Sequence, residues 1–166
     1  VRAYECTCTP PCQCCPPMCE IQEIWDLLCY IKKQYVPSTH KFKAWINSSM
    51  VKDFVHCVNL IFVGDRRMRT LNNKFLKNDK PTNVLTFPYT HDKELSGDII
   101  LCPNIINKEA KEFGFSYNFR WAHMIVHSML HLQGYTHKTN NERLSMENME
   151  VKLLKNLDFG NPYVRN

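Results

Sequence analysis

The chain has 166 residues, 44% of them hydrophobic, so it is long enough for one domain with a substantial core and short for two. No apolar run approaches the roughly 20 residues of a membrane-spanning helix, so we expect a cytoplasmic protein without a membrane partner. The net charge is only +5, and residues 66–80 carry all of this excess. Their six basic residues predict an anionic partner such as a phosphate backbone, with a solvated helix face as the simpler alternative. These residues are Arg66, Arg67, Arg69, Lys74, Lys77 and Lys80.

The first 19 residues differ from the rest of the chain. They hold six of the nine cysteines and four prolines, and few residues that could build a core. A small metal-binding or redox tail is one interpretation, and a disulfide-bonded knot is another, although no charged and apolar export signal accompanies it. We expect instead that residues 1–19 are disordered or not part of the natural protein, and that residues 20–166 form the folded domain. The other cysteines, Cys29, Cys57 and Cys102, lie in apolar segments and are expected to be buried thiols outside any disulfide.

Apolar segments separated by turn signals begin the domain. Residues 21–31 suit a first strand. Four large apolar residues then recur at helical spacing and predict a helix that begins near Ser38 or Thr39. Residues 57–63 form the clearest strand. The four apolar residues of the helix are Phe42, Trp45, Ile46 and Met50.

A basic helix is expected after that strand. Met68, Leu71 and Phe75 recur at helical spacing and predict its buried face, with the charged residues on the opposite side. Residues 84–87 are strand-like, and Pro88 is expected to end the strand because proline cannot donate to a sheet.

The second half of the chain continues the alternation of strands and helices. Residues 97–102 suit a strand, and Asn104 is expected to cap a helix that ends near Phe113. A helix with histidines follows, and residues 141–157 form the last one. Together these segments predict a single α/β or α+β domain, with a small mixed sheet of about three to four strands and about five helices.

The clearest functional signal is the segment 121–137, read as W-A-H-M-I-V-H-S-M-L-H-L-Q-G-Y-T-H. A helix turns every ~3.6 residues, so His127 and His131 lie on one face and can approach one ion. Gly134 stands where a helix would end on a left-handed residue, so the chain can turn back and bring His137 to the same ion. Three histidine ligands leave one tetrahedral position for water, as in catalytic zinc sites. We therefore expect one zinc ion per chain, held on a helix and the loop after it.

Other interpretations of these histidines are weaker. Three of the seven histidines fall within 11 residues, which argues against independently packed or solvated side chains. His123 is expected to pack beside the ligands and not to act as a fourth one. Metzincin proteases share the spacing but place a glutamate after the first histidine as general base. This chain has Ser128 there, and a serine hydroxyl cannot take a proton from water near neutral pH as a carboxylate does.

Three segments occur in the order seen in one known family. Residues 127–137 are similar to the motif H-G-x-L-H-L-x-G-Y-D-H, residues 80–88 to K-P-T-[DN]-V-L-S-F-P, and residues 97–99 to G-D-I. Together they resemble the YbeY family of bacterial single-strand-specific endoribonucleases, which act in 16S ribosomal RNA 3′ maturation and ribosome quality control. The resemblance extends from about residue 21 to the tail at residues 161–164.

The resemblance implies that His127, His131 and His137 are zinc ligands. It also implies a single-stranded RNA substrate, 16S ribosomal RNA, and the small ribosomal subunit as a partner. The six basic residues would hold the RNA backbone. No general base stands out, and the nucleophile stays open between water at the zinc ion and the RNA 2′-hydroxyl. Asp98 is the candidate for orienting a ligand histidine, although an acid that opens a strand is more often a surface residue.

Three positions depart from the family pattern. Ser128 replaces a glycine and Thr136 an aspartate, while Leu76 stands where the family has an arginine held to matter for activity. Leucine offers neither a charge nor a donor, so Lys74 or Lys77 could replace that arginine only in part. The alternative function is therefore a zinc-stabilised RNA-binding ribosome assembly factor with little or no nuclease activity.

Overall fold

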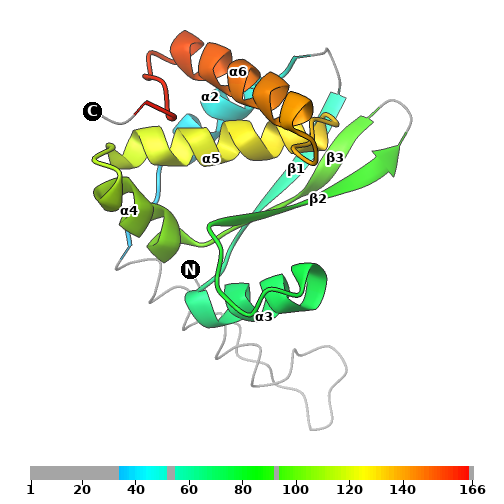
Figure 1. Cartoon of the computed structure of the whole chain (residues 1–166), viewed down its shortest axis with the longest axis vertical. Coiled ribbons are helices and arrows are strands. Elements are labelled where there is room, and N and C mark those ends of the chain that lie inside the picture. Colours follow the sequence, from blue (N-terminus) through cyan, green and yellow to red (C-terminus); the bar gives the residue numbers. More distant parts are fainter. Residues whose placement is uncertain (1–33, 52–54, 92–93, 165–166) are drawn as a thin grey trace, which may run out of the picture.

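The computed structural model describes residues 34–51, 55–91 and 94–164, which form five helices and three strands (Figure 1). This arrangement confirms the expected small mixed domain. The predictions for residues 1–19 and for a strand at residues 21–31 lie outside the described residues. In chain order the elements are α2 (Thr39–Ser48), β1 (Val55–Phe62), α3 (Asp65–Leu76), β2 (Val84–His91), β3 (Glu94–Leu101), α4 (Pro103–Glu112), α5 (Tyr117–Leu132) and α6 (Asn140–Asn156).

The three strands form a mixed sheet in the order β1-β3-β2. β1 runs parallel to β3, with Phe62 opposite Leu101. β2 runs antiparallel to β3, with Pro88 opposite Gly97. β2 therefore lies at an edge of the described sheet, and β3 lies in its centre.

α5 packs against one face of this sheet and contributes more residues to the main core cluster than any other described element (Figure 1). Its residues Trp121 and Ile125 are completely buried in a cluster that also contains Ile99 and Leu101 of β3. A helix that is apolar on nearly all sides has to be buried, and each large side chain removed from water stabilises the fold by about 1.5–3 kcal/mol. The indole nitrogen of Trp121 donates to Asn107 Oδ1 at 2.8 Å, so its polar atom is satisfied within the core.

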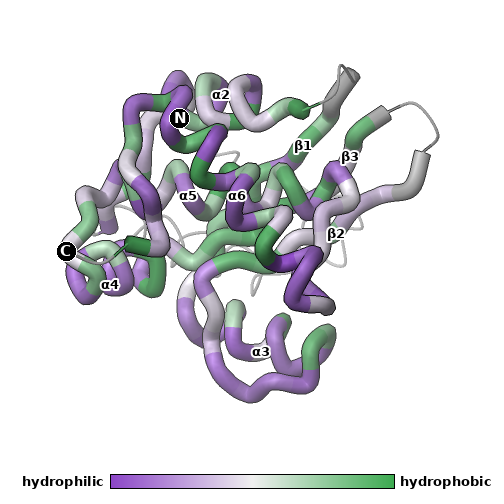
Figure 2. Tube along the Cα trace, turned by 45° about the horizontal axis from the view of Figure 1, so that its top comes forward, coloured by the Kyte–Doolittle hydropathy of each residue, from purple (hydrophilic) through white to green (hydrophobic). Residues whose placement is uncertain are grey.

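α3 covers the opposite face of the sheet. Its residue Met68 is completely buried and packs with Leu85 and Ile100 in a second, smaller cluster. Successive residues of a strand point to opposite faces, so Ile100 faces α3 while Ile99 faces α5. Most of the rest of α3 is hydrophilic, as Figure 2 shows along this helix and the segment after it, although its last two residues, Phe75 and Leu76, are apolar. The basic helix and the histidine helix therefore lie on different sides of the sheet.

Pro88 does not end β2 as predicted, because the strand continues to His91. Proline removes one backbone donor, which breaks the hydrogen-bond ladder in the middle of a sheet but is tolerated at an edge. β2 has only one neighbour among the described strands, so its outer side has no ladder to interrupt. The sequence pattern alone does not reveal which strand is at the edge.

Two residues expected in the core lie outside it. Phe75 is 50% exposed, since it lies in the last turn of α3 and packs against the edge strand, with its ring 4.8 Å from that of Phe87. Cys57 is exposed because it points away from the face of β1 that packs on α5. Cys102 is completely buried, as predicted, and Cys29 lies outside the described residues.

Asn104 is not the cap of α4. The helix begins one residue earlier at Pro103, with Cys102 as its N-cap residue. Proline suits the first helical position because its φ is already helical and its missing amide would have no partner there. The side chain of Asn104 instead donates to Asp65 Oδ2 at 2.7 Å. In the described part of the chain, no helix combines the length and apolar character that crossing a membrane requires.

Candidate metal centre

The C-terminal end of α5 builds the turn that the sequence predicts. The helix ends at Leu132, and Gly134 adopts a φ of +93° in the left-handed region. The amide of Tyr135 then donates to the carbonyl of Leu130 at 3.0 Å and closes the turn. The chain reverses at this point, so that His137 approaches the face of α5 that carries the other histidines.

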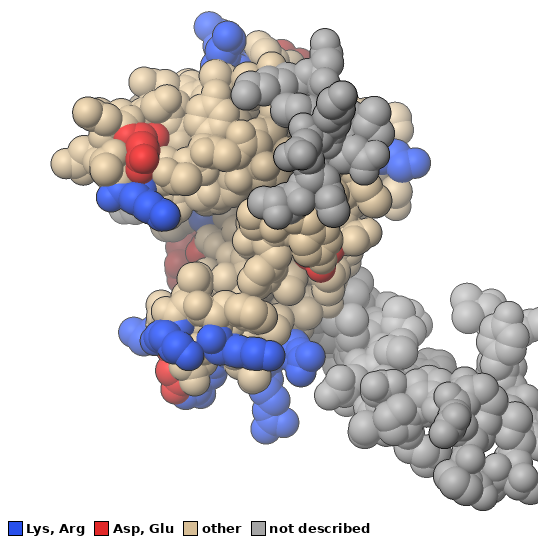
Figure 3. Space-filling view, turned by 90° about the vertical axis from the view of Figure 1, so that its right-hand side faces the viewer, with Lys and Arg blue, Asp and Glu red and all other residues tan. Residues whose placement is uncertain are grey.

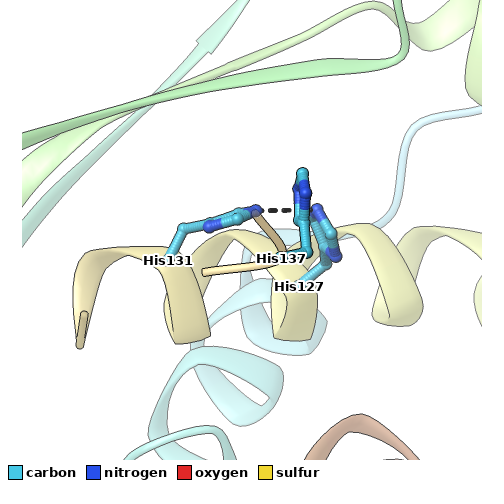
Figure 4. A group of neighbouring side chains, drawn as sticks. All are labelled: His127, His131 and His137. Carbon is cyan, nitrogen blue, oxygen red and sulfur yellow. Dashed lines mark hydrogen bonds between the residues drawn. The ribbon is translucent and has the colours of Figure 1, made fainter. Parts of the chain in front are cut away.

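The three histidines converge in the structure. One ligand atom from each of His127, His131 and His137 lies within 4.8 Å of the others. Figure 4 shows His127 and His131 rising from α5 and His137 reaching them from the segment that follows. The Nε2 atoms of His127 and His131 are 3.0 Å apart. Three imidazole nitrogens gathered in this way could hold one metal ion.

His131 is kept neutral and correctly oriented by its surroundings. Burial and the neighbouring His127 lower the pKa of His131 to about 4, so its ring carries no charge near neutral pH. Its Nδ1 lies 2.9 Å from the carbonyl oxygen of Tyr135, which can only accept, so Nδ1 carries the proton. The lone pair is therefore on Nε2, the atom that faces His127.

His127 is oriented by a carboxylate that the sequence analysis missed. Its Nδ1 lies 2.7 Å from Oε1 of Glu150 on α6, and the Glu150 side chain is only 1% exposed. Burial alone would raise the pKa of Glu150, but hydrogen bonds from His123 and His127 outweigh it and hold that pKa well below its usual range. One signal could have identified this residue: Glu150 is an acid on the same helical stripe as the buried Met146 and Leu154.

His123 supports this carboxylate and is not among the three converging histidines. Its side chain is 7% exposed, and its Nε2 lies 3.1 Å from Oε2 of Glu150. Burial lowers the pKa of His123, so the ring is neutral. The hydroxyl of Tyr163, from the C-terminal segment, also donates to Oε2 of Glu150. This arrangement agrees with the expectation that His123 packs beside the ligands.

Asp98 does not take the role predicted for it. Its carboxylate accepts from Asn59 Nδ2 at 2.9 Å and from the Tyr89 hydroxyl at 2.6 Å. These three residues lie on neighbouring strands, and their side chains point to the face away from α5. Strand alternation therefore separates Asp98 from the histidines, and Glu150 replaces it as the carboxylate that orients His127.

The six basic residues are all exposed and lie on α3 and the segment after it. Figure 3 shows lysine and arginine side chains gathered over the part of the molecule where Figure 1 places α3. One of the six is already paired, since Arg69 forms a salt bridge of 2.6 Å with Asp79. We call α3 and the segment after it, as far as Lys80, the basic lobe. Leu76, the last residue of α3, lies on this lobe and is 65% exposed. The structure does not bring these residues together with the histidines, because α3 and α5 cover opposite faces of the sheet.

Ser128 is completely buried, and its hydroxyl has no hydrogen-bond partner among the described residues. It points into the core and away from the neighbouring His127, whose side chain is partly exposed. This position cannot supply the general base of a metzincin protease, as expected from the residue type.

The fold and the site define a small mixed α+β protein with a three-histidine centre suited to a metal ion. A family model described as "Endoribonuclease YbeY" matches residues 31–158. A relative named Endoribonuclease YbeY from Wigglesworthia glossinidia brevipalpis is 40% identical over 141 residues, which cover 81% of this chain and 92% of the relative. Another relative with the same name, from Polynucleobacter asymbioticus, is 43% identical over 130 residues, which cover 78% of this chain and 83% of that relative. This chain belongs to the YbeY endoribonuclease family.

A solution structure of a protein from Thermotoga maritima is 25% identical in sequence, with a TM-score of 0.45. The match covers 85% of this chain and 93% of the Thermotoga chain. The family assignment rests on the family model and on the sequence relatives.

Proposed function

We propose that this chain is a zinc-dependent, single-strand-specific endoribonuclease of the cytoplasm that acts in 16S ribosomal RNA 3′-end maturation and in 70S ribosome quality control. The observation that carries the proposal is the convergence of His127, His131 and His137 within 4.8 Å in a chain of this family. Its substrate would be single-stranded RNA, and its larger partner the small ribosomal subunit.

The donor set fits a zinc ion. The Nδ1 atom of His127 is hydrogen-bonded to Glu150 and that of His131 to a backbone carbonyl, so in both rings Nε2 is the nitrogen left to bind an ion. The two Nε2 atoms lie 3.0 Å apart, close enough for one cation to contact both. Nitrogen ligands of this kind suit zinc, and neutral imidazoles leave the full positive charge of the ion available for a phosphate.

When bound, zinc would act as a Lewis acid toward a phosphoryl oxygen and would lower the pKa of a water molecule. The residues of the chain would do the rest. His127, His131 and His137 hold the ion, and Glu150 keeps the ring of His127 in the orientation that ligation needs. The exposed basic residues would bind the RNA backbone without reading its sequence.

The separation of the two regions constrains how RNA would bind. α3 and α5 lie on opposite faces of the sheet, so an RNA molecule that contacts both helices must pass around an edge of that sheet (Figure 1). β2 is an edge strand next to α5, and its Phe87 contacts α3. A flexible single strand can follow such a bent path, whereas a stiff duplex cannot, and this favours a single-stranded substrate.

A second candidate function rests on Leu76. This exposed leucine occupies the position at which the family resemblance places an arginine, and it cannot grip a phosphate. A zinc-stabilised RNA-binding assembly factor that docks on the small subunit without cutting would keep the same histidines and the same basic lobe. The two functions differ only in whether the bound RNA is cleaved.

Cleavage of a single-stranded RNA by the full chain, in zinc-loaded and metal-stripped forms, tests the proposal. We expect cutting by the loaded form, loss on stripping and recovery when zinc is added back. A duplex of the same sequence serves as the control and should stay intact. Tight RNA binding without metal-dependent cutting would instead establish the assembly-factor function.

A further inference from the structure

A buried carboxylate lies behind the metal centre and receives three hydrogen bonds. Glu150 accepts from His127 at 2.7 Å on Oε1, from His123 at 3.1 Å on Oε2, and from the hydroxyl of Tyr163 on Oε2. Its side chain is 1% exposed. A charged group this deeply buried is costly unless it is fully hydrogen-bonded, so an assembly of three donors around one acid needs an explanation.

The positions of the protons in this assembly follow from Arg120, which lies at the end of the assembly away from the metal centre. The guanidinium of Arg120 can only donate, and its Nη1 lies 3.0 Å from Nδ1 of His123. Nδ1 of this neutral ring must therefore be the acceptor, and the proton of His123 lies on Nε2 and points at Glu150. With His123 and Tyr163 both donating to Oε2, Oε1 remains for the Nδ1 proton of His127. The Nε2 lone pair of His127 is then directed to the metal centre.

Arg120 itself is held in place. Its Nε and Nη2 donate to Oε2 of Glu109 on α4 at 3.1 and 2.7 Å, and the same carboxylate accepts from Asn83 Nδ2. The side chains of Arg120 and Glu109 are 9% and 22% exposed. Two hydrogen bonds to one carboxylate oxygen restrain this arginine beside His123. The chain of hydrogen bonds thus runs from the start of β2 through α4, α5 and α6 to a metal ligand.

We propose that Glu150 is the positioning residue of the metal centre, and that Arg120, His123 and Tyr163 fix it so that His127 presents Nε2 to the ion. This inference rests on the metal site of the proposed function, but it concerns the ligand and not the reaction. Tyr163 makes the C-terminal segment part of the centre, although the tyrosine lies 13 residues beyond Glu150. Burial and the hydrogen bond to Glu150 raise the pKa of Tyr163, so its hydroxyl keeps the proton that it donates.

The first test needs no variant and no RNA. Nitrogen NMR of the histidine rings in the metal-free full chain reports which nitrogen carries the proton. We expect His127 with its proton on Nδ1 and His123 with its proton on Nε2. A His127 ring protonated on Nε2 in the metal-free chain would overturn the proposal.

The second test compares two identical substitutions on α6. Glu150→Gln keeps the shape but places an amide among three donors, so one of them loses its acceptor. Zinc affinity, measured by competition with a chromophoric chelator, should fall about 10–100-fold. Glu147→Gln, one turn earlier, is the matched control and should change it less than about twofold, because the partner of Glu147 in its salt bridge is the exposed Arg143 and not one of the histidines.

Tyr163→Phe keeps the test decisive if Glu150→Gln fails to fold. Tyr163 is 45% exposed, so loss of its hydroxyl should leave the fold intact. We expect a several-fold weaker zinc affinity and a mixed tautomer of His127 in the NMR spectrum. Unchanged affinity and tautomer in Tyr163→Phe would remove the C-terminal segment from the centre, and unchanged values in Glu150→Gln would end the proposal. Failure of the wild-type chain to bind zinc would instead reject the proposed function.

Discussion

Gly97 of β3 lies directly against Leu132, the last residue of α5. A methyl group on Gly97 would lie 2.6 Å from Cδ2 of Leu132 and 2.5 Å from the carbonyl oxygen of Phe87. Both distances are far inside van der Waals contact. The sheet and the end of the histidine helix are thus as close as a residue without a side chain permits, next to His131, which we propose as a metal ligand.

Gly97→Ala should therefore push the end of α5 away from the sheet. We expect the free energy of unfolding, measured by urea denaturation of the metal-free chain, to fall by about 1–3 kcal/mol through overpacking. Gly160→Ala is the control, since a methyl group there would meet nothing within 4 Å. Equal stability of the two variants would show that the contact at Gly97 relaxes without cost.

His127→Ala and His131→Ala should each abolish stoichiometric zinc binding, because two remaining imidazoles hold an ion far more weakly than three. Zinc at about a hundredfold excess over its Kd should stabilise the wild-type chain by about 2.7 kcal/mol and leave both variants unchanged. Metal content and thermal unfolding with and without zinc measure this. His40→Ala, on the exposed surface of α2, should behave like the wild type.

Leu76→Arg should raise the rate of RNA cleavage. The side chain at this position is 65% exposed, so an arginine fits without disturbing the core, and its planar fork can grip a phosphate in two places. The rate on a single-stranded RNA measures the effect. Leu144→Arg adds the same charge at an exposed position of α6 and should leave the rate unchanged. An equal gain in both variants would mean that charge alone, and not the position, matters.

Arg67→Ala and Arg69→Ala should differ in their effect on RNA binding. Each phosphate contact on a single strand contributes about 0.7 to the slope of log affinity against log salt concentration, so Arg67→Ala should reduce the slope by about this amount. Arg69 already pairs with Asp79 at 2.6 Å, and its loss should reduce the slope less. Filter binding at several salt concentrations checks this. Identical slopes would show that RNA displaces Asp79.

The local features of this protein follow from its sequence. Helical periodicity places His127 and His131 on one face, and Gly134 provides the left-handed turn that returns His137 to them. The same short-range reasoning locates the described helices and strands, because hydrophobic period and turn residues act over a few positions. It is wrong where tertiary context decides, as at Pro88, which an edge strand tolerates, and at Phe75, which the edge of the sheet leaves uncovered.

The long-range features required the tertiary structure. Glu150 lies 23 residues from His127, and only the packing of α6 on α5 makes it the carboxylate that orients this histidine in place of Asp98. Strand order and side-chain alternation likewise place the basic helix and the histidines on opposite faces of the sheet. Both outcomes depend on how separate elements pack, and a local pattern carries no information about which faces will meet.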